Sequence, residues 1–226
     1  MKILSKETIM TEITKFLRLS KFTLSKRFKD GRNNSVSDED IIIKIISESQ
    51  KFQEVLKKYN LKLLVPKERH WYDIAIVSEV PQNDLFIPIN IKSSTLKHAD
   101  NINSKLGLFY ACTGIRPETL GLSDGCGWVP FYELLEKHMD SNINCDYYFL
   151  IINKNNVSDI FWTSMKQLSK TTPNGSNWPF QCNWSKNRDL VHRTHYEARK
   201  FILNAFNDSR NKDHRHNGFK RLEKFL

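Results

Sequence analysis

Two short runs in the first half of the chain alternate between apolar and other residues, with turn-forming residues between them. They cover residues 71–77 and 86–93. Because successive side chains of a β-strand point to opposite faces, a period of two predicts a hairpin of two half-buried strands. The isoleucines of the second run then share one face, and Asn90 and Lys92 share the other. Pro88 cannot donate a hydrogen bond to a neighbouring strand, so we expect an edge position or a bulge there.

The remaining periodic segments predict helices and further strands on both sides of this hairpin. Residues 99–112 fit a helix or a strand equally well. The expected helices cover residues 5–19, 37–59, 131–139 and 192–206, and the other expected strands cover residues 61–65, 147–152 and 160–163. This order of elements predicts an α/β (α+β) fold, in which helices flank a mixed β-sheet within a single domain over residues 1–226.

The charge of the chain suggests a class of partner. The 226 residues carry a formal net charge of +10, and residues 1–36 form a basic N-terminal segment. An excess of lysine and arginine suits a polyanion, and nucleic acid is the first candidate because contacts to phosphates release counterions. A protein with spare surface lysines would have the same charge, so composition alone leaves both interpretations open.

Other features narrow the cellular setting. No stretch approaches the ~18 consecutive apolar residues that a membrane span needs, and the first residues lack the apolar core of a signal peptide. The four cysteines contain no C-x-x-C pair, which favours reduced thiols over a disulfide framework or a zinc site. We therefore expect a cytoplasmic protein with no membrane partner.

Asp73 and Lys92 are the candidate chemical groups of the predicted hairpin. Charged side chains are seldom placed beside apolar strands unless they are paired, bound to a metal or functional. A carboxylate that binds Mg²⁺ and a lysine that orients water are the minimum requirement for phosphodiester hydrolysis. Two simpler interpretations are a structural ion pair and, for Lys92, an edge-strand lysine that prevents aggregation.

Glu48 is a third candidate, on the helix expected over residues 37–59. One apolar stripe at helical spacing runs through Ile41, Ile45, Glu48, Phe52 and Val55. That phase turns Glu48 toward the core, where a lone carboxylate is costly unless it binds a cation. An alternative stripe runs through Ile42, Ile46, Ser49, Phe52 and Leu56, and it leaves Glu48 at its edge.

Asp73 and the later Asn90-Ile91-Lys92 together resemble the PD-(D/E)-x-K motif of type II restriction endonucleases. The segment Val65-Pro66-Lys67-Glu68-Arg69-His70-Trp71-Tyr72 and the segment Asn103-Ser104-Lys105-Leu106-Gly107-Leu108 are similar to the corresponding parts of EcoRV-like blunt cutters. The resemblance covers about residues 40–110, with a fainter similarity at 170–180. It implies a restriction-endonuclease-like core, which we place at residues 37–165.

The chain departs from the family pattern at two positions. Tyr72 stands where the family usually has proline, a residue that the chemistry does not require. Asn90 stands where the family has Asp or Glu, and an amide offers a metal a neutral oxygen without charge. Because some family members recruit an acid from the preceding helix, the resemblance implies that Glu48 supplies the missing charge.

The resemblance implies Mg²⁺-dependent hydrolysis of double-stranded DNA that leaves 5′-phosphate ends. Asp73, Asn90 and Glu48 would bind the metal, and Lys92 would orient the attacking water. It further implies a bacterial restriction–modification enzyme that acts as a homodimer on a palindromic, A·T-rich site such as ATTTAAAT. The alternatives are a repair or junction-resolving nuclease of the same fold and a non-catalytic basic nucleic-acid-binding protein.

Two segments are candidates for contact with DNA. Lys67, Arg69 and His70 directly precede Asp73 and are placed by sequence to reach the duplex beside the scissile bond. The second segment lies in residues 166–226, which combine a recognition loop, a helix and a basic tail. Its loop side chains suit base edges, since asparagine pairs with adenine; an ordinary surface loop would have the same composition. The loop candidates are Asn174, Ser176, Asn177 and Trp178.

Overall fold

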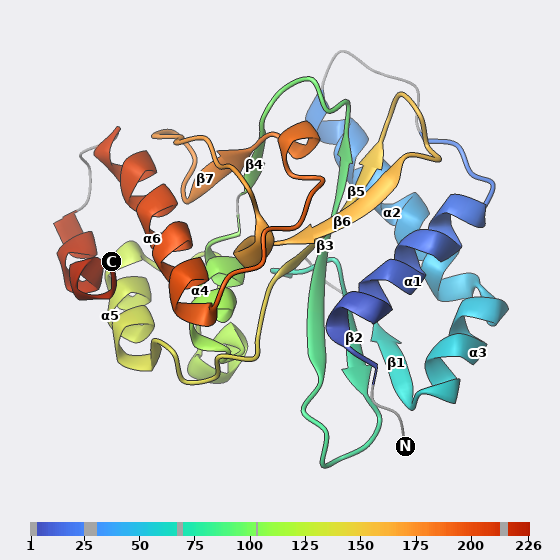
Figure 1. The fold of residues 1–226 in the computed structure, drawn as a ribbon, viewed down its shortest axis with the longest axis horizontal. Helices are drawn as coiled ribbons and strands as arrows, with labels where there is room; N and C mark the ends of the chain where they lie inside the picture. Colours follow the sequence, from blue (N-terminus) through green and yellow to red (C-terminus); the bar gives the residue numbers. More distant parts are fainter. Residues whose placement is uncertain (1–3, 25–30, 67–69, 103, 213–216) are drawn as a thin grey trace. The chain divides into compact units, whose positions relative to one another are not determined.

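The computed structural model describes residues 4–24, 31–66, 70–102, 104–212 and 217–226 (Figure 1). The chain divides into two compact units. The first unit comprises residues 1–95 and 148–162, and the second comprises residues 96–147 and 163–226.

A five-stranded mixed sheet organises the first unit. The strand order is β1-β2-β3-β5-β6. The pairs β1–β2 and β2–β3 are antiparallel, whereas β3 and β5 are parallel. The strands are β1 (Leu61–Leu64), β2 (Ile74–Ser78), β3 (Phe86–Ser94), β5 (Tyr148–Asn153) and β6 (Ile160–Ser164). The predicted α/β class, the predicted hairpin and the three other predicted strands are therefore confirmed.

Pro88 shows how one residue limits the pairing of a central strand. It lies opposite Ala75 in the β2–β3 pair. The pairing of β3 with β5 begins only at Ile89, opposite Tyr148. Proline, which has no N–H to donate, thus lies on the part of β3 that has a single neighbouring strand. The expected edge position is realised locally, although β3 is central in the sheet as a whole.

Three helices cover one face of this sheet: α1 (Lys6–Leu19), α2 (Gly31–Glu48) and α3 (Gln50–Lys58) (Figure 1). Their apolar stripes form one hydrophobic core with the isoleucines of β2 and β3. Ile87, Ile89 and Ile91 are all buried in it, whereas Asn90 and Lys92 do not belong to it. The alternation predicted for β3 is therefore confirmed.

The single helix predicted over residues 37–59 is wrong in its start and its continuity. Helix α2 begins at Gly31, and Ser49 interrupts the helical run. The Ser49 side chain accepts a hydrogen bond from the N–H of Phe52 and so caps α3. The buried positions are those of the alternative stripe, Ile42, Ile46, Phe52 and Leu56.

The second unit combines helices with a short ribbon. Residues 99–112, which fitted helix and strand equally, contain one of each, because Ser104 caps a helix directly after a strand. The ribbon pairs β4 (Asp100–Ile102) with β7 (Phe180–Cys182) in antiparallel fashion. The α-helices are α4 (Lys105–Thr113), α5 (Trp128–His138) and α6 (His195–Asn211). The 3-10 helices are η1 (Pro117–Leu120), η2 (Met165–Gln167), η3 (Trp184–Lys186) and η4 (Asn217–Phe225).

The helices of the chain are too short or too polar to cross a membrane, as far as the described residues extend.

Candidate functional site

Asp73 is held rigidly against β3 just before β2 begins. Its backbone N–H donates to the carbonyl of Ile89 at 3.0 Å. Its carboxylate Oδ2 accepts the backbone N–H of Ile91 at 2.6 Å. The two bonds attach Asp73 to the residues before and after Asn90, and the second one holds its carboxylate in place. Burial raises the pKa of Asp73, while the Ile91 N–H and the nearby Lys92 ammonium act in the opposite direction.

Lys92 lies close to Asp73 without closing a salt bridge. It pairs with Ile151 in the parallel β3–β5 ladder, so its backbone is held by β5. Its charge lowers the pKa of both Asp73 and Glu39, which places it near both carboxyl groups. Among the described residues, the ion pairs include neither Asp73 nor Lys92. The interpretation of these two residues as a structural ion pair is therefore not supported.

Asn90 contributes a polar atom that no described residue satisfies. Its Oδ1 is buried and has no hydrogen-bond partner within the described part of the chain. An unsatisfied buried acceptor costs about 1–3 kcal/mol. A partner outside the protein, such as a cation, would remove that cost. Asn90, which lies between Asp73 and Lys92 in the motif, thus has a buried oxygen atom that could bind a cation.

Glu39 is the second carboxyl group of the site, and the sequence argument missed it. Burial, followed by the negative charge of Asp73, raises the pKa of Glu39 to about 7. Asp40 raises this pKa further, whereas Lys92 and Lys154 lower it. Glu39 thus interacts electrostatically with both Asp73 and Lys92, the two charged groups of the motif.

Glu48, the predicted helix acid, does not face the core. Its side chain is 67% exposed and forms an ion pair with Lys44 one helical turn earlier, at 3.9 Å. It is nine residues from Glu39 on the same helix, a distance of roughly 13.5 Å at 1.5 Å per residue. At this separation, Glu48 and Glu39 do not belong to the same site. The exposure of Glu48 shows that its predicted position in the apolar stripe was wrong.

An ion pair next to Glu39 sets the position of its helix. The buried carboxylate of Asp38 contacts Lys154 Nζ at 2.8 Å. The backbone N–H of Lys154 in turn donates to the carbonyl of Ser94, the last residue of β3, at 2.8 Å. Helix α2 is thereby attached to the end of the strand that carries Lys92. This attachment brings the next helical residue, Glu39, to Asp73.

The donors of this site fit Mg²⁺. Asp73, Glu39 and Asn90 offer only oxygen atoms, which hard cations prefer. Within the described ranges, no three His, Cys, Asp or Glu side chains are grouped to hold a metal. Two carboxylates and an amide do not form a closed cage, but Mg²⁺ is commonly held by one or two carboxylates together with water and substrate phosphates. The orphaned oxygen of Asn90 and the raised pKa of Glu39 agree with such a cation.

The predicted DNA-contacting residues are placed unequally. Lys67 and Arg69 lie outside the described residues, and the half-buried ring of His70 packs edge-on against Tyr72 at 4.5 Å between ring centroids. Trp178 packs its ring against Trp128 and Phe206 in the aromatic core of the second unit.

The other loop candidates divide into internal and exposed positions. The Asn174 side chain is used inside the protein, because its Nδ2 donates to Asn101 Oδ1 at 2.8 Å. Ser176 and Asn177 are exposed, as expected for groups that contact a ligand.

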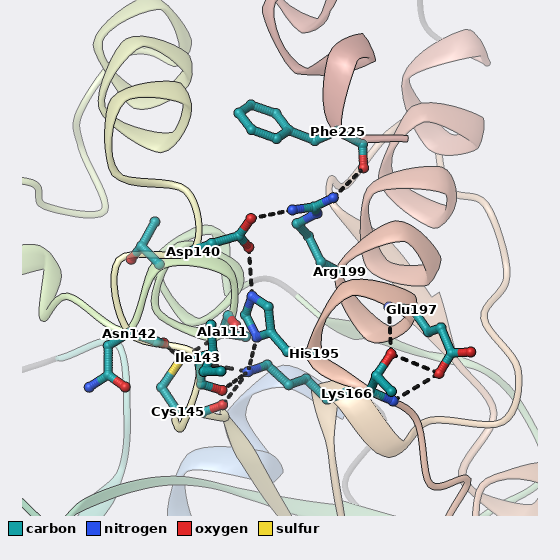
Figure 2. Close-up of polar contacts among 12 residues, drawn as sticks. Ala111, Asp140, Asn142, Ile143, Cys145, Lys166, His195, Glu197, Arg199 and Phe225 are labelled. Carbon is teal, nitrogen blue, oxygen red and sulfur yellow. Dashed lines mark hydrogen bonds and ion pairs between the residues drawn. The ribbon is translucent and has the colours of Figure 1, made fainter.

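A second polar cluster surrounds His195 at the start of α6 (Figure 2). Lys166 Nζ donates to the carbonyls of Ile143 and Cys145 and contacts His195 Nδ1 at 2.9 Å. An ammonium has three donors and no acceptor, so His195 accepts at Nδ1 and carries its proton on Nε2. That proton is donated to Asp140, at 2.6 Å.

The cluster around His195 is a structural connection and not an open site. The His195 side chain is only 7% exposed. Asp140 also receives Arg199, whose guanidinium reaches the carbonyl of Phe225. The network therefore ties the loop after α5, the start of α6 and the end of the chain together (Figure 2). Apart from the buried Nε of Arg199, which has no partner among the described residues, the side-chain nitrogen atoms of Lys166, His195 and Arg199 are bonded within the protein.

No protein-family model matches the chain, and no curated protein matches it either. A functional assignment therefore rests on the site around Asp73, Glu39, Asn90 and Lys92.

The raised pKa of Glu39 predicts an effect on stability in metal-free buffer. A carboxyl group whose pKa is higher in the folded state than in the unfolded state destabilises the fold as the pH rises from 4.5 through about 7. At about pH 8, Glu39→Gln removes this penalty and should raise the free energy of unfolding by roughly 1–3 kcal/mol. Chemical denaturation with a chelator present measures the change. Glu48→Gln is the control, and an equal gain there would contradict the assignment.

The His195 network predicts a loss of stability in mild acid. Burial, together with the charges of Lys166 and Arg199, lowers the pKa of His195 below its ordinary 6.5, although Asp140 opposes the shift. The unfolded chain therefore binds a proton first, and stability falls as the pH drops below 6.5. Thermal melting between about pH 7.5 and 5.5 should show this slope in the wild type and a smaller slope in His195→Gln. His192→Gln, at an exposed position, should keep the wild-type slope.

Proposed function

We propose that this protein is a Mg²⁺-dependent deoxyribonuclease that hydrolyses phosphodiester bonds in double-stranded DNA. The observation that carries the proposal is the grouping of two carboxyl groups, Asp73 and Glu39, with a lysine that neither of them neutralises. Like charges brought together with partial burial are unfavourable unless a cation binds between them. The net charge of +10 supports a polyanionic substrate.

Each residue of the site has a chemical role in this reaction. Asp73, Glu39 and the Oδ1 of Asn90 would hold the cation. When bound, the cation would supply positive charge that polarises the phosphate and stabilises the transition state. Lys92 would donate a hydrogen bond to the attacking water and orient it in line with the leaving 3′ oxygen. The Ile91 N–H keeps the Asp73 carboxylate in place, so the site does not have to reorganise during the reaction.

The finer proposal is a type II restriction endonuclease with a restriction-endonuclease-like core. It is supported by the positions of Asp73 before β2 and of Lys92 on the adjacent β3, and by a helix acid that replaces the charge missing at Asn90. On this proposal the protein works as a homodimer on a palindromic, A·T-rich site and belongs to a bacterial restriction–modification system.

Two other functions make different predictions for the same experiment. A junction-resolving or repair nuclease would use the same residues but would nick branched or damaged DNA without producing discrete fragments. A non-catalytic DNA-binding module would bind duplex DNA and leave it intact in both Mg²⁺ and Mn²⁺. Incubation of the purified protein in Mg²⁺ with long duplex DNA and, separately, with branched or damaged DNA separates the three outcomes, and no cleavage of either substrate would overturn the catalytic proposal.

Asp73→Asn tests the metal-binding role most directly. The substitution preserves shape but removes the charge, so cleavage should fall on the order of 10³-fold or more. DNA binding in metal-free buffer should remain, because no lysine or arginine is lost. Lys92→Ala should lower cleavage similarly, and Lys92→Arg should not restore activity, since a broad guanidinium cannot replace a compact ammonium. Glu48→Gln should retain cleavage, and wild-type cleavage by Asp73→Asn would refute the assignment.

Asn90→Asp restores the carboxylate that the family motif has at this position. If Asn90 Oδ1 contacts the cation, an added charge should tighten metal binding and change the ratio of activities in Mg²⁺ and Mn²⁺. Catalysis need not improve, because a third carboxylate beside Asp73 and Glu39 also repels the substrate phosphate. Titration of both metals measures the change, and identical curves for wild type and variant would place Asn90 outside the site.

A further inference from the structure

Three side-chain amides meet where the β4–β7 ribbon contacts the loop 171–179. Asn101 on β4 is the direct partner of Gln181 on β7. The Oδ1 of Asn101 accepts two hydrogen bonds, each at 2.8 Å, from Asn174 Nδ2 and Gln181 Nε2. All three residues are half-buried and all belong to the second unit. The cluster is therefore an ordered network on a ribbon.

The backbone decides which way each amide faces. The Oδ1 of Asn174 accepts the backbone N–H of Ser176 at 3.1 Å, so its Nδ2 must face Asn101. Asn101 consequently presents its oxygen to Asn174, and the same oxygen receives the nitrogen of Gln181. Since a backbone N–H can only donate, the orientation of all three amides follows from Ser176.

This arrangement leaves one amide nitrogen and one amide oxygen of the two ribbon residues without a hydrogen bond to any described residue. Asn101 Nδ2 and Gln181 Oε1 make no hydrogen bond with any described residue. Neither atom is among the buried polar atoms without a partner in the described part of the chain, so neither is fully enclosed by the protein. The two amides share a single hydrogen bond and not a closed pair, which keeps a donor and an acceptor available on adjacent side chains.

We propose that Asn101 and Gln181 together read the major-groove edge of an adenine. Adenine offers N7 as an acceptor and its N6 amino group as a donor, which match Asn101 Nδ2 and Gln181 Oε1. Guanine offers two acceptors at that edge and would repel the Gln181 oxygen. A two-stranded β-ribbon is an element that the major groove admits.

The proposal rests on the proposed function, because it takes DNA as the ligand. It also changes the role of Asn174, which orients Asn101 and does not itself contact a base through its Nδ2. Asn174 is thus a positioning residue, whereas Asn101 and Gln181 determine specificity.

The test compares natural DNA with base analogues. The probe is the duplex that the wild type binds best in a random library, prepared with adenine, with 7-deazaadenine, which lacks the N7 acceptor, or with purine, which lacks the amino group. Fluorescence anisotropy in metal-free buffer should show wild-type affinity falling roughly 5- to 150-fold with either analogue. Equal wild-type affinity for all three duplexes overturns the proposal without any variant.

Asn101→Asp provides the matched variant, because it replaces the free donor with an acceptor and keeps the oxygen that binds Asn174 and Gln181. The affinity of Asn101→Asp for natural DNA should fall by the factor that the wild type loses with 7-deazaadenine. Replacing adenine by 7-deazaadenine should not lower the affinity of this variant further. Asn204→Asp adds the same charge at an exposed position of α6 and should keep the wild-type response to the analogues. Thermal melting verifies that both variants fold.

The outcomes separate this inference from the proposed nuclease activity. Cleavage in Mg²⁺ together with equal sensitivity of wild type and Asn101→Asp to 7-deazaadenine would overturn the adenine contact and leave the nuclease intact. If the protein does not cleave DNA, but the wild type and Asn204→Asp lose affinity with 7-deazaadenine and Asn101→Asp does not, the adenine contact is supported and the nuclease proposal is overturned. Absence of DNA binding would overturn both.

Discussion

Partial burial of two carboxyl groups at one place is the constraint on which the first unit depends. The charge of Asp73 raises the pKa of Glu39, and burial raises the pKa of both. The protein holds them together with strong local contacts: the Ile91 N–H fixes Asp73, and the Asp38–Lys154 ion pair attaches the helix that carries Glu39. A protein selected for stability alone would separate these groups. Their proximity lowers the stability of the fold, which is consistent with a site that binds a cation.

The sheet around this site is arranged so that its central strand has two different halves. Before Ile89, β3 pairs only with β2, which leaves room for Pro88. Ile89 pairs with both neighbours, and beyond it β3 pairs with β5 in the half that carries Asn90 and Lys92. The β5 ladder on one side and the two hydrogen bonds of Asp73 to Ile89 and Ile91 on the other hold this half of β3, so side chains on it keep their positions. The isoleucines on the opposite face anchor the same residues in the core under α1, α2 and α3.

The second unit contains two polar networks with opposite properties. Around His195, each donor of Lys166 and each role of the imidazole is used within the protein, which explains why the cluster is structural. Around Asn101, the same kind of network ends with an amide nitrogen and an amide oxygen that bond to no described residue and are not fully enclosed. A satisfied network rigidifies a fold, whereas the amide network with unused groups is the one for which we propose a ligand. This difference, and not residue type, separates the two clusters.

The sequence alone predicted the five strands of the main sheet and the face on which Asn90 and Lys92 lie, because a period of two leaves only two choices and the isoleucines decide between them. It did not predict β7 and left β4 undecided between helix and strand. It did not determine which helix acid faces Asp73. Two apolar stripes fitted the isoleucine-rich segment, and acids at residues 38–40 are equally typical of an ordinary helix start. Only packing against the sheet selected the phase that buries Ile42 and Ile46 and exposes Glu48. Likewise, Trp178 looked like a loop residue until aromatic neighbours from distant segments were brought to it. Local periodicity specifies an element and its faces, but which side chains meet across elements depends on contacts between residues far apart in the chain, which only the tertiary structure supplies.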